Sequence, residues 1–188
     1  MSRAYKVSIQ EAQTREIKAG DEICSQIELL PILPPEEMEY LLRCELAQHG
    51  FQEAEGTMQR TTGTVLVAID PCSGVIRVKA QIQKSLALLV EKTGEVYDRV
   101  EEAARMRLSL VEKARDEIEH QAEEQRKSFQ LDATEKLESH LHELRPEIDQ
   151  IANRVMTQAL QKKAATLGTI KAISEDNNTG TMTITIEV

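Results

Sequence analysis

Aromatic residues are scarce in this sequence of 188 residues, which contains three tyrosines, two phenylalanines and no tryptophan. Apolar residues still make up 40% of the chain, so a packed core is possible, built mainly from aliphatic side chains. The aromatic residues are Tyr5, Tyr40, Phe51, Tyr97 and Phe129. Most of them fall near the N-terminus, so we expect the compact part of the protein there.

Other absences exclude whole classes of protein. No apolar run approaches the roughly 20 residues that a transmembrane helix needs, and the sequence begins without an apolar signal segment. Acidic residues outnumber basic ones by 32 to 23, and the net charge of -9 disfavours binding to nucleic acid. The three cysteines form no CxxC pair and suit a reduced compartment. We therefore expect a cytoplasmic protein that neither inserts into membranes nor binds nucleic acid.

The common motifs of catalysis and metal binding are also missing. The sequence contains no phosphate-binding GxxxxGK loop, no GxGxxG, no HExxH and no GxSxG. His140 and His142 are two residues apart, so on a helix they would point about 200° apart and could not share one metal ion. Neighbouring acidic residues occur in pairs within the charged segment 94–166. A solvated helix gives them no desolvated pocket, which acid–base catalysis would need. We expect no enzyme, no catalytic residue, no cofactor and no metal site.

Residues 1–92 are predicted to form an α+β head domain, which begins with strands. Period-two alternation of apolar residues predicts strands at 5–9, at 13–19 and, after a turn at Gly20-Asp21, at 23–29. Prolines at 31, 34 and 35 end this run and lead into a helix over residues 35–49. Gly50 is placed to stop that helix in the left-handed conformation.

The head is predicted to continue with a β-hairpin. Its arms are residues 64–69 and 75–80, joined by the turn residues Asp-Pro-Cys-Ser-Gly at 70–74. The return arm is expected to reach about residue 83. Residues 84–92 fit a strand and a helix about equally well, and Lys92-Thr93-Gly94 is expected to break the chain.

Residues 94–166 are predicted to form a long, charged, coiled-coil-like helical arm. Pro146 either separates two helices or kinks one continuous helix, and the pattern favours neither. Apolar residues spaced four and three apart run across the proline and predict a seam for helix association. The seam consists of Leu137, Leu141, Leu144, Ile148, Ile151 and Val155. We therefore expect homo-oligomers that associate through the arm.

Residues 168–188 are predicted to form a C-terminal β-hairpin. An alternating segment runs into a polar loop that ends in Thr179-Gly180, and a second alternating segment follows. A two-stranded hairpin alone is marginal in water. We expect it to close back onto the sheet of the head, or to pair with a partner or a second copy.

Several N-terminal segments together resemble a bacterial family, the FtsH ternary system X-domain proteins. The resemblance rests on residues 1–8, on Glu-Leu-Leu-Pro-Ile-Leu-Pro at 28–34, on Gly50-Phe51 and on the turn at 70–74, and it covers about residues 1–80. It implies a small accessory protein that acts beside an FtsH-like AAA+ ATPase and von Willebrand factor A proteins. The family brings no catalytic residue to this sequence.

The sequence therefore predicts an α+β protein with a helical arm and a terminal hairpin. Its expected role is a non-enzymatic scaffold or adaptor in a multi-protein assembly with an AAA+ ATPase. The alternative is an enzyme or a small-ligand-binding protein whose site lies in the head, near the loop 31–35 and Cys24 or Cys72.

Overall fold

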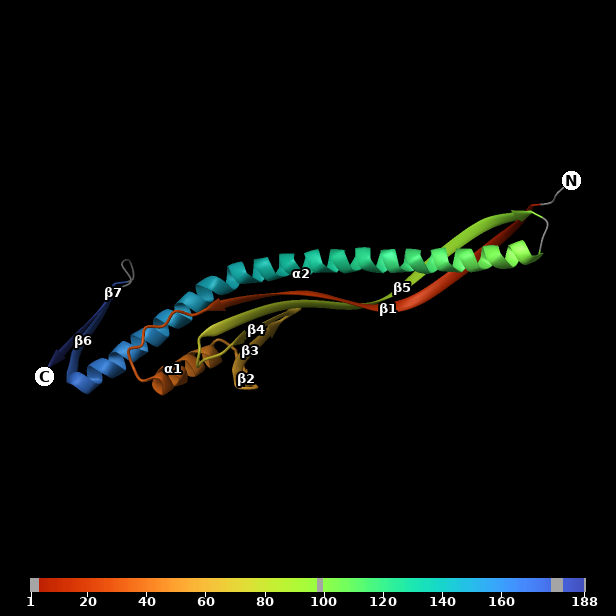
Figure 1. Cartoon of the computed structure of the whole chain (residues 1–188). Helices are drawn as coiled ribbons and strands as arrows, with labels where there is room; N and C mark the ends of the chain where they lie inside the picture. The colour runs from red at the N-terminus through yellow and green to blue at the C-terminus, as the bar shows by residue number, and fades with distance from the viewer. Residues whose placement is uncertain (1–3, 98–99, 177–180, 188) are drawn as a thin grey trace. The chain divides into compact units, whose positions relative to one another are not determined.

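The computed structural model describes residues 4–97, 100–176 and 181–187. Its elements are β1 (Ala4–Gln26), α1 (Pro35–Gln48), β2 (Gln52–Ala54), β3 (Thr57–Thr62), β4 (Val65–Ile69), β5 (Val75–Tyr97), α2 (Val100–Leu167), β6 (Thr169–Asp176) and β7 (Thr181–Glu187) (Figure 1). Five strands form one sheet in the order β1-β5-β4-β3-β2, and β6 and β7 form a second one. The predicted α+β class, with its short helix, long helix and terminal hairpin, is confirmed.

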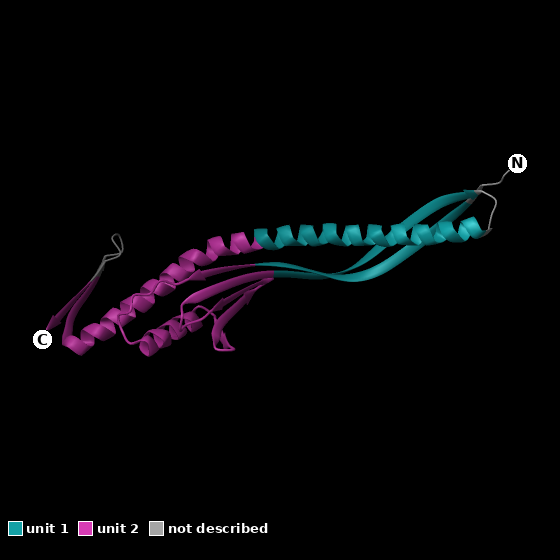
Figure 2. Cartoon of the chain, viewed as in Figure 1, with its two compact units in different colours: residues 1–21, 81–135 teal, residues 22–80, 136–188 magenta. Residues whose placement is uncertain are grey.

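The internal contacts of the chain divide it into two compact units, which Figure 2 colours separately. Unit 1 comprises residues 1–21 and 81–135, and unit 2 comprises residues 22–80 and 136–188. The strands β1 and β5 and the helix α2 contribute residues to both units. The predicted division into head, arm and hairpin follows chain order rather than contacts, and it stays a prediction.

In unit 2, β4 shows why this part of the sequence forms a sheet. It pairs antiparallel with β3 and β5, and its alternate residues Val65, Val67 and Ile69 are buried. The turn after β4 closes because the Gly74 N–H donates to the Asp70 carbonyl at 2.8 Å and Gly74 adopts a φ of +71°. The predicted hairpin is confirmed.

The helix α1 confirms the prediction for residues 35–49 to within one residue. Glu36 and Glu37 occupy its first turn, where carboxylates interact favourably with the helix dipole. After the helix, Gly50 has a φ of +81°, and the N–H of the buried Phe51 donates to the Leu46 carbonyl at 3.1 Å.

The turn predicted at Gly20-Asp21 is wrong, because β1 continues through both residues. Within unit 1, α2 provides hydrogen-bond partners at this point. Gln130 Nε2 donates to the Gly20 carbonyl at 2.9 Å, and Thr134 Oγ1 donates to Asp21 Oδ2 at 2.9 Å. Residues that often form turns are thus held extended by a helix more than one hundred positions away in the sequence.

The break predicted at Lys92-Thr93-Gly94 is also wrong, because β5 extends to Tyr97 and includes the undecided residues 84–92. A Cβ atom on Gly94 would lie 3.1 Å from the Met106 sulfur of α2. The missing side chain therefore lets the helix approach the strand closely, so this glycine serves packing rather than a turn.

The first half of α2 packs onto strands of its own unit. Leu110 joins a buried cluster with Val7 and Val96, and Ala114 and Ile118 join another with Val90. Further along α2, residues 123–128 are all polar and all exposed. The first half of the expected helical arm is therefore a helix that covers a sheet in this unit, because its alanine-rich stripe matches the apolar faces of β1 and β5.

The helix α2 continues through Pro146, which decides between the two alternatives that the sequence left open. Leu144 and Ile148, on either side of the proline, are both buried. Proline removes one backbone hydrogen bond and disturbs the preceding turn. Burial of these two apolar side chains favours a continuous helix and acts against that cost.

The β6–β7 hairpin forms where it was predicted. The expectation that it closes back onto the main sheet is wrong for the described residues, since β6 and β7 form a two-stranded sheet of their own. The chain enters it directly from α2 through Gly168, where a Cβ atom would lie only 2.4 Å from the Glu187 carbonyl oxygen. Only glycine permits this close junction of helix and hairpin.

Candidate interaction surface

A groove of about 600 Å³ lies in unit 2 between strands and the second half of α2. It is lined by residues 23–26 of β1, by Ile76 and Val78 of β5 and by residues of α2 from Glu138 to Asp149. The buried Val78, Leu144 and Ile148 provide an apolar base. The volume is in the range of sites that hold small ligands or a few side chains of a peptide.

The α2 side of the groove carries charge of both signs. Glu138, His142, Arg145 and Asp149 are exposed and lie four, three and four positions apart, so they follow one side of the helix. Together with the apolar base, this edge offers ionic contacts beside a hydrophobic surface. Protein-binding surfaces commonly combine an apolar centre with a polar rim.

One ionic cluster joins α2 to β3 and to the end of α1 within unit 2. Both Glu147 carboxylate oxygens accept bonds from the Arg60 guanidinium, at 2.7 and 2.6 Å. Arg60 also donates to the His49 carbonyl at 2.9 Å and lies over the ring of Phe51. Mainly through the hydrogen bond with Arg60, the pKa of Glu147 is held below its ordinary value and that of Arg60 is raised.

A second cluster surrounds Glu45 of α1, whose exposed fraction is only 2%. Arg154 of α2 donates to Glu45 Oε1 at 3.0 Å, and Gln158 donates to Oε2 at 3.3 Å. His49 Nε2 lies 3.8 Å from the same carboxylate. A buried carboxylate needs such partners because desolvation of an unpaired charge is costly. This cluster therefore fixes α1 against α2.

Sequence reasoning did not single out Glu45 or Glu147. A signal for Glu45 was present, because it lies four positions after Leu41 and three after Leu42, on the buried stripe of α1. Glu147 offered no comparable signal. Its partner Arg60 is 87 positions away in the sequence, and only folding brings the two together.

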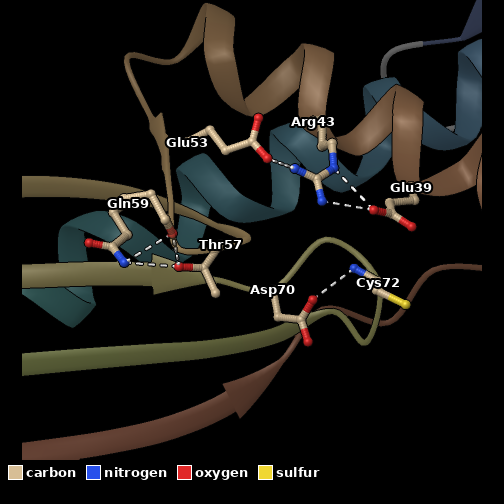
Figure 3. Close-up of polar contacts among 8 residues, drawn as sticks. Glu39, Arg43, Glu53, Thr57, Gln59, Asp70 and Cys72 are labelled. Carbon is tan, nitrogen blue, oxygen red and sulfur yellow. Dashed lines mark hydrogen bonds and ion pairs between the residues drawn. The ribbon is translucent and has the colours of Figure 1, made fainter.

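The polar contacts in Figure 3 stabilise the loops beside α1. Arg43 donates to Glu39 Oε1 at 2.8 Å and to Glu53 Oε1 at 2.6 Å. In the turn after β4, Asp70 accepts bonds from the Ser73 hydroxyl at 2.6 Å and the Cys72 N–H at 3.0 Å. These bonds, that from Ser73 most of all, lower the pKa of Asp70. Both sets of contacts shape the surface rather than form a reactive centre.

Of the residues named for the alternative site in the head, the structure places Cys24 in the groove. Cys24 is exposed and lines the groove, whereas Cys72 is exposed elsewhere in unit 2, and neither it nor loop 31–35 is among the lining residues described. His142 lines the groove, while the half-buried His140 points its Nε2 atom to no hydrogen-bond partner in the described part of the chain. Among the described residues no group of histidines, cysteines and carboxylates could hold a metal ion.

The predicted association seam is used inside a single chain. Leu137, Ile151 and Val155 are fully buried, Leu144 and Ile148 are nearly so, and Leu141 lines the groove. Self-association through this seam stays a prediction. The burial leaves little of the other five side chains available to a second copy.

The complete chain, residues 1–188, matches the family described as FtsH ternary system domain X5. The chain belongs to this family. The match extends beyond the N-terminal segments that carried the resemblance and includes α2 and the β6–β7 hairpin. No curated protein and no solved structure matches the chain. Among the helices of the described residues, none combines the length and apolar character needed to cross a membrane.

Proposed function

We propose that this protein is a non-enzymatic accessory subunit that binds other proteins of an FtsH-linked AAA+ system. The observation that carries the proposal is the family match over residues 1–188. The family name points to an assembly with several components, and the partners proposed for this chain are an FtsH-like AAA+ ATPase and a von Willebrand factor A protein.

The contacts of Glu45 and Glu147 favour a structural role for these two carboxylates over a catalytic one. Glu45 and Glu147 are bonded to arginines that come from other elements, so their charge holds α1, β3 and α2 together. The groove in unit 2 offers both an apolar base and charged edge residues. We assign it to a segment of the AAA+ partner that presents an apolar side chain flanked by polar residues.

Co-purification with the two candidate partners tests this function. Ile23 is 38% exposed and lines the groove, so Ile23→Asp should weaken binding to the ATPase by about tenfold or more, because it places a charge on the apolar surface. Leu160→Asp is the matched control, since Leu160 is 41% exposed, belongs to unit 2 and lies outside the groove. Circular dichroism verifies that both variants remain folded.

The possible results separate the parts of the proposal. Failure of the wild-type protein to bind either candidate partner contradicts the accessory role. If Ile23→Asp and Leu160→Asp lose binding equally, or if both bind like the wild type, the assignment of the groove is contradicted. The complex of the wild-type protein with its partner remains established in either case.

A small-ligand site is the second candidate function, and the presence of Cys24 and His142 in the same groove favours it. A thiol and an imidazole can bind or react with electrophilic ligands. A fragment screen by nuclear magnetic resonance tests this candidate. Shifts confined to groove residues, lost in a Cys24→Ser variant, would support it, and binding of partner proteins without any such shifts would disfavour it.

A further inference from the structure

The β6–β7 hairpin has one apolar and one polar face. Its register pairs Ile170 with Ile186 and Ile173 with Ile184, and residues directly opposite each other in a sheet share a face. The four isoleucines therefore lie on one side. Thr185 pairs with Ala172 and Thr183 with Ser174 on the other side.

A β-bulge is needed to produce this separation. Ile170 and Ile173 are three positions apart, so in a regular strand they would point to opposite faces. The register shifts between Ile170 and Ala172, and the additional residue, Lys171, restores the alignment with Ile184 and Ile186. The hairpin therefore concentrates its apolar residues on one face through a specific local irregularity.

None of the hairpin side chains described, at residues 169–174 and 183–187, is buried, and Ile173 is 43% exposed. A two-stranded sheet whose apolar face is only partly covered is marginal in water, whereas three or more strands can be stable. The hairpin therefore gains stability if another strand pairs with it.

The two outer edges of the hairpin differ in their protection. The edge formed by β6 contains the bulge and Lys171, whose ammonium group lies 2.7 Å from Glu187. Bulges and lysines are features that discourage pairing at sheet edges. From Thr181 to Ile186, β7 contains no charge and no proline, and it alternates threonine with isoleucine or methionine. The edge of β7 is thus open to another strand.

We propose that β7 pairs antiparallel with β7 of a second copy of this chain, which gives a four-stranded sheet in the order β6-β7-β7-β6. A two-fold axis at Ile184 aligns all residues of β7, from Thr181 to Glu187, with those of the other copy. In this register Ile184 lies opposite itself, and Thr183 lies opposite Thr185 of the second copy. The isoleucines of both copies then share one face, whereas a slip by one residue would mix the two faces.

The proposed register keeps like charges apart when the occupant of this edge is a second copy. A chain with a net charge of -9 repels its own copies, so self-association requires a contact surface without like charges. The register places each Glu187 opposite Thr181, which keeps the two Glu187 residues about 20 Å apart at roughly 3.4 Å per residue. A strand that is its own partner also closes the assembly as a two-fold dimer, the commonest symmetry of oligomers.

Sedimentation equilibrium over a wide range of protein concentration tests the proposal. The wild type should dimerise reversibly. In the variant Thr183→Lys with Thr185→Lys, each lysine faces a lysine of the other copy, and the dissociation constant should rise about tenfold or more. In Thr183→Lys with Thr185→Glu, lysines face glutamates, so dimerisation should be retained or strengthened.

Ser174→Lys is the control, because it adds a lysine to the same face but on β6. It should leave dimerisation unchanged. Retention of the dimer in the lysine–glutamate variant also shows that two substitutions in β7 do not simply unfold the hairpin.

Three results would overturn the proposal. One is a wild-type protein that stays monomeric at every concentration. Another is a dimer unaffected by the two lysines but lost in Ile184→Thr, which would indicate stacking of the isoleucine faces instead. The third is a dimer that survives all these changes, which would locate the contact elsewhere. The measurement needs no AAA+ partner, so its outcome is independent of the proposed function.

Discussion

The hairpin formed by β4 and the beginning of β5 and the hairpin formed by β6 and β7 come from similar sequences but differ in burial. Both alternate apolar and polar residues around a polar turn or loop. In the first, Val67 and Ile69 of β4 and Val78 of β5 are completely or almost completely buried. In the second, Ile184 and Ile186 are half-buried and Ile173 is exposed.

An alternating pattern therefore determines which face of a strand is apolar but not whether that face is covered. The first hairpin continues into a five-stranded sheet, and its β5 residues Ile76 and Val78 share the groove with Leu144 and Ile148 of α2. The second hairpin has two strands alone. The first hairpin therefore removes much more apolar area from water. Each Å² removed stabilises the folded state by about 25 cal/mol.

The largest expected effect contrasts one isoleucine from each hairpin. Ile69→Ala removes a fully buried side chain and should lower the free energy of unfolding of unit 2 by about 2–5 kcal/mol. Ile173→Ala alters a side chain that is 43% exposed and should change the free energy of unfolding by less than about 0.5 kcal/mol. Urea unfolding followed by circular dichroism measures both. Equal losses would remove the distinction between the hairpins.

The next effect concerns the ionic cluster that joins α2 to β3. Glu147→Gln replaces a carboxylate that accepts two bonds from Arg60 and should cost about 1–3 kcal/mol. Because the pKa of Glu147 is lowered in the folded protein, its contribution is present above the unfolded pKa of about 4.3 and is lost as pH falls through the folded value.

Urea unfolding at a series of acidic pH values measures this dependence. The wild type should lose stability below about pH 4.3 more steeply than Glu147→Gln. Glu143→Gln, an exposed change one turn earlier on α2, is the control and should keep the wild-type slope. Identical slopes for all three proteins would contradict the role of the cluster.

A smaller effect is expected in the turn of the first hairpin. Asp70→Ala removes the acceptor of the bonds from Ser73 and the Cys72 N–H, and should destabilise unit 2 by about 1 kcal/mol. Amide hydrogen exchange should also accelerate at Cys72. Unchanged exchange and stability would show that Pro71 and Gly74 suffice to form the turn.

The smallest effect is expected in the second hairpin. Lys171 and Glu187 form an ion pair at 2.7 Å with side chains that are 56% and 61% exposed. Lys171→Ala should therefore change the stability of the hairpin by less than about 0.5 kcal/mol. The temperature dependence of the Ile184 methyl resonances measures it. A large loss would mean that this pair, rather than strand pairing, holds the hairpin.

Much of the fold could be predicted because its signals are local. Proline at the start of α1 and glycine after it define that helix, and Asp70 to Gly74 define the turn between β4 and β5. The failures at Gly20 and Gly94 have one cause. At both glycines α2 makes contacts with a strand, and these contacts outweigh the local preference for a turn.

The candidate site was less predictable than the fold. Cys24 was named from the sequence and does line the groove, but the ionic partners of Glu45 and Glu147 could not be inferred. Their partners are distant in the sequence, and charged residues on a helix normally face water. The seam from Leu137 to Val155 was correctly placed on one stripe of α2, but the sequence could not tell whether its cover comes from the same chain.

Signals that lie within a few residues of each other suffice to predict the helix α1, both hairpins, and the apolar stripe of α2. The sequence also carries the family membership, since the match spans residues 1–188. Packing between distant segments, by contrast, sets the course of α2 through Pro146 and of β1 and β5 through their glycines. It also leaves the β6–β7 hairpin as a separate sheet. These outcomes depend on which apolar faces meet, and burial is a property of the folded chain rather than of a local segment.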